Sequence, residues 1–328
     1  MIQAIGESQV SGADAVQAVR DGVAICDRSH WGRIEISDSD RLAFLHNQST
    51  NHIKRLQPGQ GCETVIINST ARTIDLVSVY SKQDSLLLLV SPGRDEHLMQ
   101  WFDRYIFFQD KIKLANLTES TGTISLIGPK SSELLTNLDW ELPDELHHHT
   151  SVEHDGSTIT IAKGSGLASE GFTLFFDCAI ADALGTQLVN AGATPIGESA
   201  WENLRISEGR PKVDAELTDK YNPLEACLWH LVSFNKGCYI GQEIIARLDT
   251  YDGVKQKLWG LESSAPLQVN DSITQKAQKV GVVTSVDTSG QRALAYVKTR
   301  AGGEGDQVQV GEAIATLTEV PFLTREKA

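Results

Sequence analysis

The fold class that the sequence predicts is α+β, with a small antiparallel β-barrel at the C-terminal end. Strands and helices alternate through residues 1–254, but polar turns such as 81–84 join neighbouring strands and favour antiparallel hairpins over a doubly wound sheet. After Lys257, short β-type segments are divided by Gly, Asp and Ser, which is typical of a small barrel. We therefore predict a larger domain at residues 1–254, with two subdomains, and a barrel domain at 255–328.

Each predicted element rests on the period of its apolar residues. Runs of aliphatic and β-branched residues predict strands at 34–36, 65–67, 74–80, 86–90, 112–117, 123–127, 158–161 and 172–176. Apolar residues at helical spacing predict helices around Leu42–Leu45 and at 95–107, 131–138, 180–190, 198–207 and 242–248. The barrel strands are predicted at 258–261, 280–286, 293–297, 308–310 and 313–316.

One predicted helix, 95–107, carries an aromatic stripe. We interpret the stripe as a core face rather than a cofactor site, because helical spacing of apolar residues is the ordinary signature of packing. Its members are Leu98, Trp101, Phe102, Tyr105 and Ile106.

Composition and charge exclude several classes of protein. The 328 residues are 41% hydrophobic and 22% charged, which is ordinary for a soluble globular protein. The net charge of −14 disfavours direct binding of duplex nucleic acid. Residues 1–20 lack the apolar core of a signal peptide, and the longest aliphatic run, 86–90, is too short to span a membrane. We expect a cytoplasmic protein with no membrane contact.

The cysteines form no metal or disulfide pattern. Five cysteines are present and none belongs to a C-x-x-C pair, so neither a disulfide framework nor a self-contained zinc or cluster site is expected. A histidine run at 147–149 could bind a metal, but it lies between loop-like residues 143–144 and 155–156. We predict a solvated loop there, and no metal ligand.

The segment 236–243, Lys-Gly-Cys-Tyr-Ile-Gly-Gln-Glu, is the strongest chemical signal in the chain. Cys238 lies two residues after Lys236 and shortly before the predicted helix 242–248, and both features lower the pKa of a thiol. The alternative is a small buried hydrophobic side chain. Neither feature is evident for Cys26, Cys62 or Cys178. The apolar neighbours of Cys227 would raise the pKa of that thiol.

These residues also carry a resemblance. The octapeptide 236–243 resembles the signature of the YgfZ family, whose members are relatives of the glycine-cleavage T-protein, the GcvT aminomethyltransferase. The match runs from about Asp27 to Gly260, and four further segments are similar to stretches shared by both groups. They are 27–32, 68–75, 201–211 and 221–226. The resemblance implies an N-terminal α+β folate-binding region and a C-terminal barrel, arranged around a central channel.

The implied ligand is tetrahydrofolate. A pterin edge rich in N–H donors suits a carboxylate, and the resemblance gives Asp75 and Glu208 as the candidate acids. An Asp among the apolar neighbours of a strand is unfavourable unless it is paired or functional. The T-protein pattern has a further acid where this chain has Leu76, and its pterin-binding glutamate where this chain has Ser207. Glu208 stands one residue later, about 100° around a helix.

Cations and aromatic side chains complete the expected site. Arg205 and Arg247 are candidates for the anionic tail of the folate, or alternatively for structural ion pairs with nearby acids. Trp31, Trp229 and Tyr239 are candidates for the walls around the pterin, with core packing as the alternative for each.

The function that the resemblance implies is support of iron–sulfur protein assembly or repair, including enzymes that methylthiolate tRNA. Cys238 would be the working thiol with Lys236 beside it, and the partners would be iron–sulfur proteins or their assembly factors. One alternative is a folate-dependent aminomethyltransferase of the T-protein type, with Asp75 at the reacting nitrogen. Another is a cluster scaffold, which demands a partner chain because one thiol cannot hold a cluster. Whether there is catalytic turnover stays open.

Overall fold

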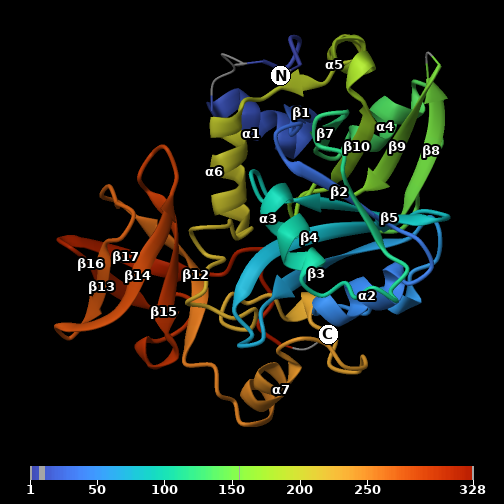
Figure 1. Ribbon diagram of the computed structural model, residues 1–328. Coiled ribbons are helices and arrows are strands. Elements are labelled where there is room, and N and C mark those ends of the chain that lie inside the picture. The colour runs from blue at the N-terminus through green and yellow to red at the C-terminus, as the bar shows by residue number, and fades with distance from the viewer. Residues whose placement is uncertain (1, 7–11, 155, 327–328) are drawn as a thin grey trace. The chain divides into compact units, whose positions relative to one another are not determined.

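The computed structural model describes residues 2–6, 12–154 and 156–326 (Figure 1). The chain divides into two compact units, and each is described by itself. The first unit consists of residues 1–46, 52–64 and 77–201, and the second of residues 47–51, 65–76 and 202–328. Short segments from the N-terminal half therefore belong to the same unit as the C-terminal barrel.

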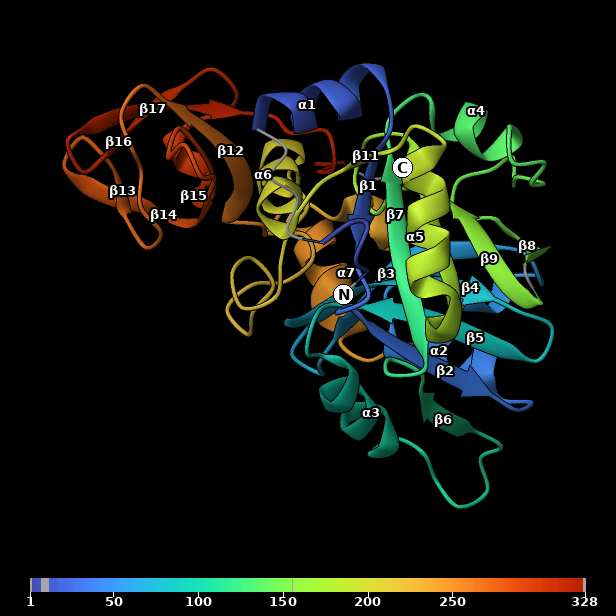
Figure 2. The same cartoon turned by 90° about the horizontal axis from the view of Figure 1, so that it is seen from above.

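A six-stranded sheet forms half of the first unit. Its strand order is β11-β1-β7-β10-β9-β8, antiparallel except where β1 pairs with β11. Helices α4 (Ser131–Thr136) and α5 (Ala181–Asn190) contribute leucines to its apolar core, and Figure 2 shows α5 along β7. The strands are β1 (Ala24–Asp27), β7 (Thr121–Ile127), β8 (His149–His154), β9 (Ser157–Lys163), β10 (Gly171–Asp177) and β11 (Thr194–Pro195).

A five-stranded sheet has the order β3-β4-β5-β2-β6. Strand β5 lies in the middle and is buried along its whole length, so it needs the unbroken aliphatic run that made it predictable. Helices α2 (Arg41–Gln48) and α3 (Asp95–Asp103) contribute Phe44 and Phe102, whose rings meet edge to face at 5.8 Å. The strands are β2 (Gly32–Ser37), β3 (Gly61–Ile67), β4 (Thr73–Ser81), β5 (Ser85–Val90) and β6 (Lys113–Asn116).

The second unit contains a closed barrel with the strand order β12-β15-β14-β13-β16-β17 (Figure 1, orange and red). Its interior is filled by alternate aliphatic side chains, such as Leu261, Val283 and Leu317. The strands are β12 (Gln256–Ser263), β13 (Ser272–Gln275), β14 (Gln278–Val286), β15 (Arg292–Lys298), β16 (Gln307–Val310) and β17 (Ala313–Thr318).

A second apolar core in this unit lies outside the barrel interior. It joins residues of β3 and β4 to the end of helix α6 (Glu198–Glu208), the segment 213–232 and helix α7 (Gln242–Thr250). Tyr221 and Tyr296 stack within it, with ring centroids 3.5 Å apart. This core brings together most of the segments that carried the resemblance.

The predicted fold class is confirmed, and so are the positions of the predicted strands and helices. Helix α3 is shorter than predicted and ends at Asp103, where the Tyr105 amide donates to the Phe102 carbonyl oxygen at 2.9 Å in place of a helical bond. Residues 107–110 form a separate turn, in which Asp110 accepts a hydrogen bond from the Phe107 amide at 2.8 Å. Only Leu98 and Phe102 of its stripe are fully buried. The sequence prediction missed helix α1 (Gly12–Asp21) and strands β1, β8, β11 and β13.

The histidine run was also partly misassigned. His149 does not lie in a solvated loop but opens strand β8, and its Nε2 lies 2.9 Å from the carbonyl oxygen of Ser81. Burial lowers the pKa of His149. Among the described helices, none is both long and apolar enough to cross a bilayer.

Candidate functional site

The octapeptide 236–243 ends in a turn that leads into helix α7. Gly241 has φ = +78°, a left-handed conformation that favours glycine. A Cβ at this position would lie 2.7 Å from the carbonyl oxygen of Asn68 and 3.1 Å from the amide nitrogen of Ala71. The octapeptide therefore packs directly on the turn 68–72, and both the conformation and the close approach require Gly241.

The turn 68–72 is organised by one side chain. The Asn68 Oδ1 accepts hydrogen bonds from the amides of Thr70 and Arg72, each at 2.9 Å. Ala71 takes a left-handed φ of +57° inside this turn. The turn leads directly into β4 and so fixes where Asp75 lies on that strand.

A third segment closes around the same place. The Thr73 amide donates to the carbonyl oxygen of Tyr221 at 3.0 Å, and Arg72 donates to the carbonyl oxygen of Lys220 at 2.8 Å. Arg72 also forms an ion pair with Glu225 at 3.6 Å. Three separated segments with family resemblance, 68–75, 221–226 and 236–243, are thus one contiguous region of the second unit.

Asp75 lies fully buried in β4, inside this region. Its Oδ1 accepts a hydrogen bond from the Leu76 amide at 2.8 Å. A buried carboxyl is costly unless hydrogen bonds or a partner compensate for the loss of water. Asp75 is thus a polar side chain enclosed within this region.

Glu208 is the last residue of α6, and its side chain is buried. Gly209 follows with φ = +88°, and the amides of Gly209 and Arg210 both donate to the Arg205 carbonyl oxygen at 2.8 Å. Ser207 points elsewhere: its hydroxyl donates to the Leu204 carbonyl oxygen at 2.9 Å, and it lines a depression of about 230 Å³ beside the barrel. Glu208, rather than position 207, therefore provides the buried acid at this helix end.

Lys236 anchors the octapeptide. Its ammonium donates to the carbonyl oxygens of Ser49 and Asn51, both at 2.6 Å, and lies 4.7 Å from the centre of the Tyr239 ring. Tyr239 is half-buried, and burial raises its pKa to about 12. Lys236 thus ties a loop to chain nearly 190 residues earlier, and Gly237 and Cys238 remain exposed beside this tie.

The five cysteines fall into clearly different environments. Cys26 and Cys227 are buried. Burial raises the pKa of Cys26 to about 12 and also raises the pKa of Cys227, as predicted from its apolar neighbours. Cys238 and Cys178 are exposed, and Cys62 is half-buried. Cys238 is therefore accessible to reagents, in contrast to the buried alternative.

Cys178 is the other exposed thiol. It is the first residue of a 3₁₀ turn (Cys178–Ile180) that leads into α5. Its exposure makes it the matched control for Cys238.

The two candidate arginines differ. Arg205 is buried, and its guanidinium donates to both carboxyl oxygens of Glu202, at 2.6 and 2.7 Å, and to Glu216 at 3.3 Å. Burial opposes ionisation of Glu202, but Arg205 outweighs it and lowers the pKa of that carboxyl. This geometry favours the structural ion pair for Arg205. Arg247 is exposed in the last turn of α7.

The candidate aromatic residues also differ. Trp31 belongs to the first unit and is 7% exposed; the Arg28 guanidinium lies 3.7 Å from its ring centre and 4.4 Å from that of Trp201. This environment favours core packing for Trp31. Trp229 belongs to the second unit and stacks on Phe234 at 5.9 Å. No three His, Cys, Asp or Glu side chains of the described residues are grouped to hold a metal ion.

The comparisons with known proteins decide the family. Residues 7–236 match the model of the GCVT N-terminal domain. The chain belongs to that family. A chloroplastic protein of Arabidopsis thaliana with the name "Putative transferase" is 42% identical over 320 residues, which cover 95% of this chain and 74% of that protein.

More distant relatives agree on fold. An aminomethyltransferase of Exiguobacterium sibiricum is 29% identical over 94% of this chain and 89% of its own length. The crystal structure of the glycine cleavage system aminomethyltransferase T from Bartonella henselae superposes with a TM-score of 0.85, at 19% identity, over 98% of this chain and 92% of that one. The GcvT-like fold, with its C-terminal barrel, is thereby shown.

Proposed function

We propose that this member of the GcvT family is a tetrahydrofolate-binding protein of the YgfZ type, which supports the assembly or repair of iron–sulfur proteins through Cys238. The observation that carries the proposal is the construction of the octapeptide. Lys236 and Gly241 fix it at either side, and Cys238 stands exposed between them. A thiol presented in this way suits reaction with a partner molecule better than packing.

The folate part of the proposal uses Asp75 and Glu208. Both are buried carboxyls in the second unit, and a carboxylate is the natural acceptor for the paired N–H donors of a pterin edge. Tyr239 supplies an apolar face that stays uncharged across the physiological range, since its pKa is raised to about 12. Arg247 is the cation left for the anionic tail, because the Arg205 guanidinium is engaged by Glu202 and Glu216.

Calorimetric titration with tetrahydrofolate tests this part. We expect wild-type protein to bind folate more tightly than free nucleotides or tRNA, and Asp75→Asn to bind it at least tenfold more weakly at a nearly unchanged melting temperature. Asp219→Asn is the matched control, since Asp219 is exposed in the same unit. Absence of folate affinity at millimolar concentration would remove the folate claim, and unfolding of Asp75→Asn would make Asp75 structural.

The thiol part is tested in cells that lack the gene. Cys238→Ser should keep the fold and folate binding but fail to restore iron–sulfur enzyme activity, including tRNA methylthiolation. Cys178→Ser removes the other exposed thiol and should restore activity fully. Full rescue by Cys238→Ser would mean that the octapeptide acts through its turn and not through sulfur.

A second candidate function is aminomethyl transfer, favoured by the relatives that carry that name. Leu76 and Ser207 stand where the T-protein pattern has acids, so stabilisation of charge at a reacting nitrogen would rest on Asp75 and Glu208 alone. We expect methylene transfer from an aminomethylated carrier protein to be absent or very weak, and robust transfer would favour this candidate. A cluster scaffold remains a third candidate and would require a second chain to supply ligands.

A further inference from the structure

Residues 320–325, which follow the last barrel strand, form a strap against the end of helix α6. The Phe322 amide donates to the carbonyl oxygen of Glu208 at 2.8 Å. Val320 packs so closely on Gly209 that a Cβ there would lie 2.2 Å from its Cγ2, and the Arg210 guanidinium lies 5.0 Å from the centre of the Phe322 ring. The strap therefore touches Glu208 and both residues that follow it.

The far end of the strap is fastened by Arg325. Its guanidinium donates to the Leu258 carbonyl oxygen at 3.0 Å and to the Cys227 sulfur at 3.1 Å. It also stacks over Trp259, 3.5 Å from the ring centre, and pairs with Glu319 at 3.3 Å. One side chain thus joins the strap to strand β12 and to the segment around Cys227.

Thr324 adds a second fastening. Its amide donates to the Cys227 carbonyl oxygen at 2.8 Å, and its Oγ1 accepts from the His230 amide at 3.0 Å. The same Oγ1 lies 2.7 Å from His230 Nδ1, and the tautomer of the imidazole decides which of the two atoms donates. Cys227 itself holds a left-handed φ of +56°. The strap is therefore bound to a constrained backbone.

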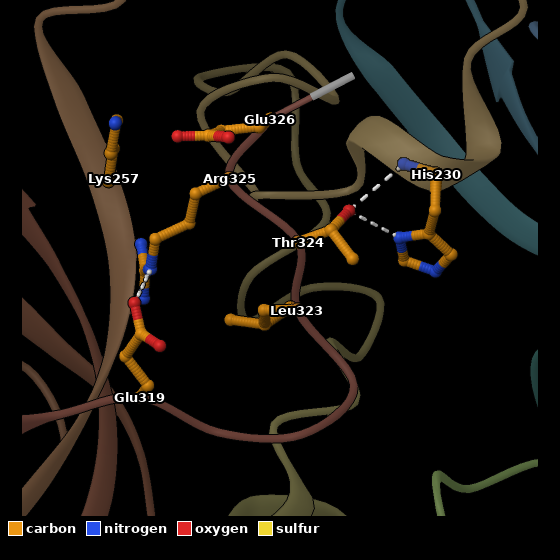
Figure 3. A pocket seen from close by; sticks show the side chains of 7 residues that line it. All are labelled: His230, Lys257, Glu319, Leu323, Thr324, Arg325 and Glu326. Atoms are coloured by element: carbon orange, nitrogen blue, oxygen red, sulfur yellow. Dashed lines mark hydrogen bonds and ion pairs between the residues drawn. The ribbon is translucent and has the colours of Figure 1, made fainter. Parts of the chain in front are cut away.

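Apolar burial and specific contacts together hold the strap, since Val320, Phe322 and Leu323 belong to the apolar core of the second unit. The strap borders a depression of about 570 Å³ lined by His230 on one side and Lys257 and Glu319 on the other (Figure 3). Figure 3 shows Leu323, Thr324 and Arg325 running between these two sides. Because residues 323–325 border this open space, loss of the Arg325 contacts would loosen the strap at that end.

We propose that the strap positions Glu208 for its ligand, with Arg325 and Phe322 as positioning residues. The inference rests on the proposed folate function, because Glu208 is the acid through which the strap would affect folate binding. Helix α6 ends at Glu208, where the Gly209 and Arg210 amides cap it by donating to the Arg205 carbonyl oxygen, and the strap adds a second constraint from outside. A buried carboxylate that binds a rigid pterin must be held to a fraction of an ångström.

A double-mutant cycle tests the proposal by calorimetry with tetrahydrofolate. We expect Arg325→Ala to raise the Kd about tenfold, and Arg292→Ala, an exposed barrel arginine paired only loosely with Glu262, to leave it unchanged. In a Glu208→Gln background, Arg325→Ala should produce no further loss, because its effect passes through Glu208. A full tenfold loss in that background, or no loss in wild type, would overturn the proposal.

Amide hydrogen exchange separates this inference from the folate claim. The amides of Gly209 and Arg210 should exchange faster in Arg325→Ala and in Phe322→Ala than in wild type, while Phe322→Leu should restore most of the protection. If wild-type protein binds no folate, the proposed function fails. Faster exchange of the Gly209 and Arg210 amides in the alanine variants would still show that the strap constrains this helix end. Unchanged exchange in both alanine variants would overturn the positioning role, whatever the folate result.

Discussion

Two segments with the same kind of family resemblance occupy opposite environments. In the first unit, segment 27–32 places Arg28 at 1% exposure between Trp31 and Trp201, with its guanidinium donating to Ser125 and to the Ser165 carbonyl oxygen. In the second unit, the octapeptide leaves Gly237 and Cys238 exposed. The comparison teaches that segments with the same family resemblance can differ in burial, so that one contributes to the core while the other presents a thiol at the surface.

The largest effect should come from the buried motif. Arg28→Ala removes buried cation–π contacts with Trp31 and Trp201 and the hydrogen bonds to Ser125 and Ser165, and it leaves a cavity, so we expect the free energy of unfolding to fall by about 3–5 kcal/mol. Equilibrium unfolding in urea measures this change in the free energy of unfolding. Arg20→Ala serves as the control because Arg20 pairs only with Asp21 at the surface, and it should change nothing measurable. A small effect of Arg28→Ala would erase the contrast between the two motifs.

High pH should distinguish a buried thiol of the first unit, Cys26, from an exposed one, Cys178. Folding raises the pKa of Cys26 to about 12 from an ordinary value near 9, so the folded state holds this proton while the unfolded state releases it. The part of the free energy of unfolding that this proton contributes is therefore fully present below pH 9. It is lost between pH 9 and 12, by up to about 1.4 kcal/mol per pH unit. Cys26→Ala should flatten this fall in urea unfolding, whereas Cys178→Ala should not.

The turn of the octapeptide should tolerate substitution less than an open turn. Gly241→Ala adds a Cβ 2.7 Å from a carbonyl oxygen as well as the cost of a left-handed φ, and we expect a loss of about 2–3 kcal/mol. Gly311→Ala, at φ = +59° with nothing within 4 Å, isolates the conformational cost of about 1 kcal/mol. Equal losses in thermal unfolding would show that the approach to Asn68 is relaxed in solution.

The smallest effect on stability should come from Cys238, the thiol that we propose as functional. Cys238→Ser changes an exposed atom, so we expect the free energy of unfolding to move by less than about 0.5 kcal/mol. A thiol reagent followed by peptide mapping should label Cys238 and Cys178 well before Cys26 and Cys227. Early labelling of Cys227 would instead indicate that the strap opens readily.

Local patterns predicted much of the fold, since strands such as β5 and the barrel strands are dense in aliphatic residues. The sequence prediction missed strand β8 (His149–His154) because this strand lies at a sheet edge and needs no alternation of apolar residues. Helix α3 was overextended because aromatic residues continued the helical spacing beyond Asp103, into a turn closed by Asp110. Periodicity identifies elements well when a full face of them is buried.

The sequence predicted candidate residues for the site but not the tertiary contacts that hold them. Nothing local to Lys236 indicates that its ammonium binds the carbonyl oxygens of Ser49 and Asn51, because backbone carbonyls have no sequence signature. The displacement of the acid to Glu208 was visible, but its burial depended on where α6 ends. The strap contacts on Glu208 and Gly209 come from more than a hundred residues away and follow only from the tertiary structure.

The edges of the six-stranded sheet have a consequence for self-association. An unpaired strand edge is a template on which a second chain can add a strand. Here one edge is β11, only two residues long and ending in Pro195, which has no amide to donate. The other edge is β8, a polar strand in which His149, Glu153 and His154 prevent a continuous apolar, aggregation-prone segment. The barrel is closed and offers no edge. The six-stranded sheet is thereby protected at both edges against the addition of strands from other chains, and replacing Glu153 and His154 with valine would remove that protection at β8.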